Sequence, residues 1–144
     1  MIVVSACLAG LNCRYDGKNM LDPEIARMVL EGQAISVCPE CLGGLKVPRP
    51  PAEIKEGTGA DVLDGRCNVM NIEGEDVTSN YLTGAYMTLD LAKSVNADKA
   101  ILKKKSPSCG TEDIYNGAFT GDLRKGKGVT AELLQRNSIK IEGR

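Results

Sequence analysis

The stretch Ile2-Val3-Val4-Ser5-Ala6-Cys7 determines the fold, because a short β-branched apolar run leads directly into small residues and a cysteine. An apolar run of this length and composition predicts a buried strand. Residues 34–37 and 100–102 are also largely apolar and predict two more strands, and Ile139 and Ile141 predict a fourth strand at residues 139–141.

Helical signals separate these strands. Asp22-Pro23-Glu24 opens a first helix, because an N-cap, a proline at the first helical position and an acidic side chain follow one another. A longer helix begins at Asp76 or Thr78 and ends near residue 96, and a third begins at Thr130.

A chain that alternates strands with helices forms a parallel sheet with right-handed crossovers. The predicted fold is therefore α/β, with a three-layer, Rossmann-like and mostly parallel sheet. Residues 61–76 contain two candidate turns and predict a small β excursion from it. At 144 residues, the chain is expected to form a single domain over residues 1–144.

Composition excludes several classes of function. The net charge of -1 provides no broad basic surface, so we expect no nucleic-acid partner. Aromatic residues make up only 3% of the chain. No apolar run reaches the length of a membrane span, and the first residues lack the features of a signal peptide. We expect a cytoplasmic protein that acts as a monomer or homodimer on a small molecule and has no membrane partner.

The chain contains six cysteines and no histidine. In the cytosol thiols stay reduced, so clustered cysteines indicate metal binding or catalysis rather than disulfides. Cys7 and Cys38 follow the first and second predicted strands, and Cys109 lies in the loop after the third. Ligands of open α/β sheets bind along the carboxyl edge of the strands. These three cysteines are therefore predicted to meet at one site.

Several interpretations of the cysteines stay open at this point. Cys67 is interpreted as a buried structural residue. Cys38 and Cys41 form a C-x-x-C pair, which could be a redox dithiol, although no helix signal opens at Cys38. Structural zinc sites usually contain two such closely spaced cysteine pairs, and this sequence contains only one. Three thiolates from three loops would suit an iron–sulfur cluster with one iron free of protein ligands.

Polar residues near the cysteines are candidates for the remaining chemistry. Without histidine, proton transfer must depend on Asp, Glu, Lys, Tyr or Ser. Each candidate also has an ordinary structural interpretation, as a surface carboxylate, a turn serine, a solvated lysine or a spacer between prolines. The candidates are Glu40, Ser106 and Asp16 for catalysis, and Arg49, Ser108 and Lys103 for substrate binding.

Three groups of motifs together resemble a known family. The first joins residues 5–10 to Cys13-Arg14-Tyr15-Asp16-Gly17, and the second runs from Val37-Cys38-Pro39-Glu40 to Ile54. The third contains Ser106-Pro107-Ser108-Cys109-Gly110 and continues to residue 131. They resemble a small bacterial family, long known only as a domain of unknown function, that includes the thiouracil desulfidases.

The resemblance implies a 4Fe–4S cluster bound by Cys7, Cys38 and Cys109, which could be lost from protein prepared in air. The fourth iron would capture the sulfur of a thiolated pyrimidine such as 2-thiouracil, and sulfide would be released without net redox. Glu40 and Ser106 match positions suited to proton transfer and substrate orientation. The family pattern does not require Cys13 or Cys41.

Two other functions compete with a desulfidase. One is a non-catalytic iron–sulfur or metal-binding module that serves a partner enzyme. The other is a dithiol oxidoreductase that uses Cys38 and Cys41.

Overall fold

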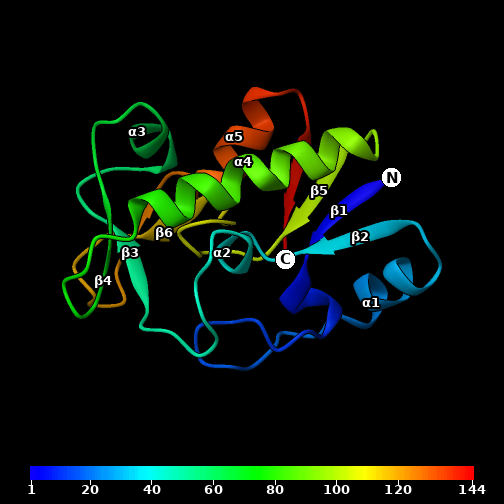
Figure 1. The fold of residues 1–144 in the computed structure, drawn as a ribbon, viewed down its shortest axis with the longest axis horizontal. Helices are drawn as coiled ribbons and strands as arrows, with labels where there is room; N and C mark the ends of the chain where they lie inside the picture. Colours follow the sequence, from blue (N-terminus) through cyan, green and yellow to red (C-terminus); the bar gives the residue numbers. More distant parts are fainter.

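A four-stranded parallel sheet forms the centre of the computed structural model, which describes residues 1–144 (Figure 1). Every neighbouring pair of strands in it runs parallel, which confirms the predicted α/β class. The strands, in spatial order, are β2 (Ala34–Val37), β1 (Ile2–Ser5), β5 (Lys99–Leu102) and β8 (Lys140–Gly143).

Helices cover both faces of the sheet, as the three-layer prediction requires. Figure 1 shows α4 (Thr78–Ser94) and α5 (Val129–Arg136) on one side, and α1 (Pro23–Leu30) on the other. A short 3-10 helix, η1 (Ala6–Ala9), follows β1 and packs with α1. None of the helices combines the length and apolar character that a membrane span needs.

Alternating side chains of the strands build two separate cores. Val3 belongs to the larger core beneath α4 and α5, whereas Val4 belongs to the smaller core beneath α1. Successive strand residues point to opposite faces, so both must be apolar when both faces are covered. This explains why the first three residues of β1, Ile2-Val3-Val4, form a continuous apolar run.

The N-terminus of α1 is fixed as the sequence predicts. One oxygen of Asp22 accepts hydrogen bonds from the backbone N–H groups of Glu24 (3.0 Å) and Ile25 (3.4 Å). The other oxygen accepts from Arg144 Nη1 at 2.9 Å, which joins α1 to the end of β8. The hydrogen bond from Arg144 lowers the pKa of the Asp22 carboxyl.

The predicted β excursion at residues 61–76 is only partly correct. Its first part is a helix, α3 (Gly59–Leu63), in which the backbone N–H of Thr58 donates to Asp61 at 2.9 Å in a capping box. Its second part is β4 (Val69–Asn71), which pairs antiparallel with β3 (Ala52–Ile54).

Two further elements form where a loop was expected. The Gly- and Lys-containing segment after β5 contains an antiparallel pair, β6 (Asp113–Tyr115) and β7 (Leu123–Lys125). A short helix, α2 (Pro39–Leu42), opens directly after Cys38, so the expectation of no helix there is wrong. Tertiary contact with α4 supports α2, since Asn80 Nδ2 donates to the carbonyl of Gly43 at 2.8 Å.

Replacing Ile25 by alanine should destabilise the protein strongly. Ile25 is fully buried in the small core against η1, so its loss removes buried apolar area and leaves a cavity. We expect Ile25→Ala to lower the free energy of unfolding, measured in urea, by about 2–5 kcal/mol. Leu30→Ala on the same helix is the control, because Leu30 is 88% exposed. Equal stability losses in the two variants would contradict the assignment of this core.

Candidate functional site

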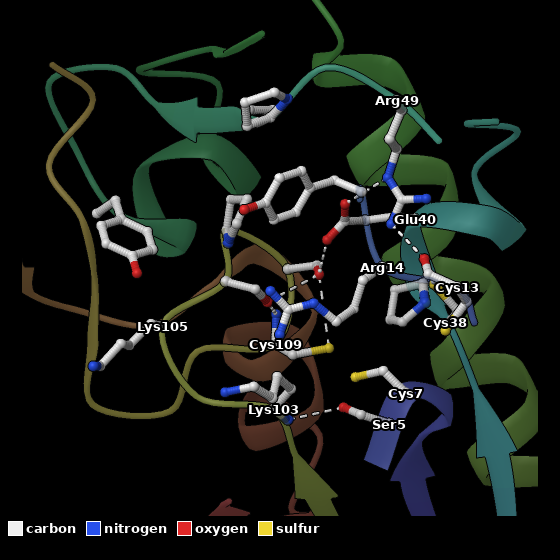
Figure 2. A pocket seen from close by; sticks show the side chains of 18 of the residues that line it. Ser5, Cys7, Cys13, Arg14, Cys38, Glu40, Arg49, Lys103, Lys105 and Cys109 are labelled. Atoms are coloured by element: carbon white, nitrogen blue, oxygen red, sulfur yellow. Dashed lines mark hydrogen bonds and ion pairs between the residues drawn. The ribbon is translucent and has the colours of Figure 1, made fainter. Parts of the chain in front are cut away.

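The carboxyl edge of the sheet opens into a cavity of about 550 Å³ (Figure 2). Cys7, Cys38 and Cys109 all line it. Cys7 lies in η1 directly after β1, Cys38 precedes α2, and Cys109 lies in the loop after β5. The structure thus brings together the three cysteines that were predicted to converge.

Hydrogen bonds within its own turn hold Cys109 in place. Its backbone N–H donates to Ser106 Oγ at 2.7 Å, and the N–H of Gly110 donates to the Ser106 carbonyl at 3.0 Å. The Ser108 hydroxyl lies 3.7 Å from the Cys109 sulfur. Small residues let this turn fold back on itself beside the cavity.

The three thiols differ in acidity. Burial raises the pKa of Cys109 to about 11. A hydrogen bond with Cys13 raises the pKa of Cys38, and burial raises it further. At Cys7 the hydrogen bond with Cys13 has the opposite effect and lowers the pKa. Metals bind the thiolate, so binding at Cys38 and Cys109 would release their protons.

The other two cysteines of the motifs lie beside Cys38. The carbonyl of Cys13 is 3.8 Å from the Cys38 sulfur and 4.0 Å from the Cys41 sulfur. Cys13 lines the cavity and Cys41 does not. Burial raises the pKa of Cys41 to about 11. The short helix therefore does not make Cys38 or Cys41 an acidic thiol of the kind used by redox dithiols.

Glu40 has the most extensive hydrogen bonding in the cavity. One carboxylate oxygen accepts from Arg49 Nε at 3.1 Å and from the Tyr81 hydroxyl at 3.0 Å. The other accepts from the Ser108 hydroxyl at 2.7 Å. The Glu40 side chain is 13% exposed and that of Arg49 is 7% exposed, so the ion pair is largely shielded from water.

Arg49 lines the cavity, but acceptors of the protein occupy its guanidinium. Besides Glu40, it donates to the carbonyl of Cys13 at 2.8 Å and to that of Lys46 at 3.1 Å. It therefore joins α2 to the loop that contains Cys13.

Of the remaining predicted site residues, three line the cavity and one does not. Ser106 Oγ lies 3.3 Å from Ser108 Oγ, and both serines line the cavity. Lys103 lines it too, near Cys7 and Cys109 in Figure 2, and burial lowers the pKa of its ammonium. Asp16 does not line the cavity, and it pairs with Arg14 Nε at 3.4 Å.

Sequence reasoning missed Tyr81 and Ser5. Tyr81 fits the apolar stripe of α4, so its pattern indicates only a core residue. Ser5 accepts the backbone N–H of Lys103 at 2.9 Å and thereby joins β1 to the loop that leaves β5. No local pattern predicts the contact that either residue makes, because each partner is distant in sequence.

Two glycines allow α2 to lie against α4. A Cβ at Gly84 would stand 1.9 Å from the carbonyl oxygen of Pro39, and one at Gly43 would stand 2.0 Å from that of Asn80. Only glycine fits at such an approach. This contact sets the position of α2, and with it the positions of Cys38 and Glu40.

The donor set suits a cluster better than a single ion. No three His, Cys, Asp or Glu side chains converge closely enough to bind one metal ion. In an iron–sulfur cluster each cysteine binds a different iron, so the sulfurs surround the cluster instead of meeting at a point. Three cysteines around one cavity fit that requirement.

Comparison with known proteins identifies the family. The profile described as 2-thiouracil desulfurase matches residues 2–143. The chain belongs to the 2-thiouracil desulfurase family. The predicted resemblance is thereby confirmed over almost the whole sequence.

Two relatives of this desulfurase family member are informative. The uncharacterized protein YbbK of Bacillus subtilis (strain 168) is 49% identical over 141 residues, which are 98% of this chain and 93% of YbbK. A solved structure of the [4Fe-4S]-dependent thiouracil desulfidase TudS (DUF523Vcz) is 39% identical and superposes with a TM-score of 0.87. The match covers 99% of this chain and 89% of that one.

A side chain at position 84 should destabilise the packing of α2 against α4. Gly84→Ala places a methyl group against the backbone of Pro39 and must displace α2 or α4. We expect the free energy of unfolding in urea to fall by about 1–3 kcal/mol, as overpacking commonly costs. Thr83→Ala is the control, because Thr83 is exposed on the same helix. If Gly84→Ala were as stable as the control, α2 and α4 could move apart without loss of free energy of unfolding, and their close approach would not stabilise the fold.

Proposed function

We propose that this chain is a [4Fe–4S]-dependent desulfidase that exchanges the sulfur of a thiolated pyrimidine, such as 2-thiouracil, for oxygen. The thione and one water yield the corresponding pyrimidone and hydrogen sulfide, and no electrons are gained or lost. The observation that carries the proposal is the grouping of Cys7, Cys38 and Cys109 around one cavity that also contains Glu40. The likeness to the thiouracil desulfidase structure supports it.

We assign Cys7, Cys38 and Cys109 as the residues that would hold the cluster. Three protein ligands leave one iron of four without one, and that iron would supply a soft Lewis acid suited to a thiocarbonyl sulfur. Cys41 lies outside the cavity lining, which supports leaving it out of the ligand set. We leave Cys13 out as well, because a fourth thiolate would close the open iron.

Positive charge beside the cysteines supports an anionic group there. Lys103 and Arg14 both line the cavity, and Figure 2 shows Lys103 beside Cys7. Opposite charges in close proximity favour the ionised form of each group. Asp16 belongs to this arrangement through its ion pair with Arg14, and we assign it to positioning Arg14.

Glu40 is proposed as the base that takes a proton from the attacking water. Its hydrogen bonds to Arg49 and Tyr81 fix one carboxylate oxygen and orient the other toward Ser108. The hydroxyls of Ser108 and Ser106 continue from that oxygen as a hydrogen-bonded chain. This chain can hold the pyrimidine and move a proton along the cavity wall.

Removing one proposed ligand tests the cofactor and the reaction together. Protein purified without oxygen should contain iron and labile sulfide in the amounts of one [4Fe–4S] cluster, and should release sulfide from 2-thiouracil. Cys109→Ser should lose most of both. Cys67→Ser is the matched control and should keep both, because Cys67 lies outside the cavity lining. A wild-type protein that holds the cluster but releases no sulfide would favour a non-catalytic iron–sulfur module.

Glu40→Gln distinguishes a role of Glu40 in proton transfer from a role in holding the cluster. The variant should keep the visible absorbance of the cluster and lose about 10²- to 10⁴-fold in the rate of sulfide release, the usual contribution of a general base. Glu31→Gln, at the exposed end of α1, should behave as wild type. Full turnover by Glu40→Gln would rule out Glu40 as the base.

A further inference from the structure

The few aromatic side chains of this chain gather in one place. The sequence contains four tyrosines, one phenylalanine and no tryptophan. The cavity is lined by Tyr15, Tyr81, Tyr115 and Phe119, and only Tyr86, exposed on α4, lies elsewhere.

Two of these four rings already have a polar partner in the cavity. The Tyr81 hydroxyl donates a hydrogen bond to Glu40, and the guanidinium carbon of Arg14 is 5.7 Å from the centroid of the Tyr15 ring. The side chains of Tyr115 and Phe119 make no hydrogen bond or cation–π contact with the residues around the cysteines.

Tyr115 and Phe119 come from a different part of the fold from the cysteines. Tyr115 is the last residue of β6, and Phe119 lies in the loop that leads to β7. Figure 1 shows β6 beside β3, away from the four-stranded sheet whose carboxyl ends carry the cysteines. The cavity therefore has a wall built by the β6–β7 hairpin.

A buried carboxylate holds the loop that contains Phe119. One oxygen of Glu53, which is 8% exposed, accepts from the N–H of Gly117 at 2.9 Å and from that of Phe119 at 3.2 Å. Gly117 has a φ of 95°, and a Cβ there would stand 2.5 Å from the carbonyl oxygen of Ile54. The loop thus lies directly on β3.

Phe119 itself adopts a costly backbone conformation. Its φ is 57°, in the left-handed region that aromatic residues rarely occupy. The ammonium of Lys55 stands 5.3 Å from the centroid of its ring, and Lys55 does not line the cavity. The cation–π contact and the two hydrogen bonds from Glu53 together fix a half-buried ring at the cavity wall.

We propose that Phe119, with Tyr115, forms an aromatic wall against which the pyrimidine ring of the substrate stacks. The inference rests on the proposed function and adds the feature that selects a planar heteroaromatic thione. Flat rings attract each other through offset stacking, which a single thiocarbonyl group without a ring cannot exploit. Glu53 and Lys55 act as positioning residues, because Glu53 accepts from the backbone of the loop that contains Phe119 and Lys55 contacts the Phe119 ring.

Variants of Phe119 test the wall. In Phe119→Ala we expect KM for 2-thiouracil, and the Kd for uracil measured by calorimetry, to rise about 5- to 100-fold, as stacking losses do. The visible absorbance of the cluster should match wild type. Phe119→Tyr keeps a ring and should stay near wild type, whereas Phe119→Leu keeps apolar bulk and should resemble the alanine variant. Tyr86→Ala is the control and should change neither constant.

The outcomes separate this inference from the proposed function. Unchanged KM and Kd in Phe119→Ala would overturn the aromatic wall while leaving the desulfidase intact. Wild-type constants in Phe119→Leu would overturn stacking in favour of simple apolar contact. If wild-type protein released no sulfide, the proposed function would fail, and the calorimetric comparison of uracil binding would still decide whether the wall exists.

Discussion

The carboxylate of Glu40 joins four segments of the chain around the cavity, and the geometry of the site depends on it. Its own helix α2, Arg49 in the proline-rich loop, Tyr81 on α4 and Ser108 after β5 all meet there. Under the proposed function the same carboxylate must also accept a proton. Its hydrogen bonds therefore have two purposes: they hold the segments together and they preorganise the base.

Backbone contacts also determine where the cysteine loops lie. The first turn of α5 donates to the loop that contains Cys109, through Val129 N to the Pro107 carbonyl at 2.8 Å and Thr130 N to the Ser108 carbonyl at 2.9 Å. A Cβ at Gly128 would stand 2.5 Å from the carbonyl carbon of Ser108, so the two backbones touch. Together with the approach of α2 to α4, these contacts leave little freedom for Cys38 and Cys109. A rigid arrangement of distant thiols suits a ligand set that must match a cluster of fixed shape.

The cavity divides into two chemically distinct walls. The cysteines, the serines and the cations lie at the carboxyl edge of the four-stranded sheet, where α/β proteins commonly bind ligands. The β6–β7 hairpin contributes Tyr115 and Phe119, and β3 supports it through Glu53. The sheet edge is a feature of the fold class, whereas the hairpin is an addition to it. We infer that the first wall determines the chemistry and the second determines which thiolated compound fits.

Local patterns were sufficient to predict the four parallel strands, the helices α1, α4 and α5, and the three cysteines that share one edge. These follow from apolar periodicity, from caps such as Asp22, and from the rule that parallel strands present their carboxyl ends together. The motifs around the cysteines were sufficient for the family. The helix α2, the contacts of Arg49, the hydroxyl of Tyr81 on Glu40 and the gathering of aromatic side chains were decided only by the tertiary structure. Each depends on partners many residues away, such as Gly84 against Pro39 or Glu53 against Phe119, and no local propensity encodes a contact of that kind.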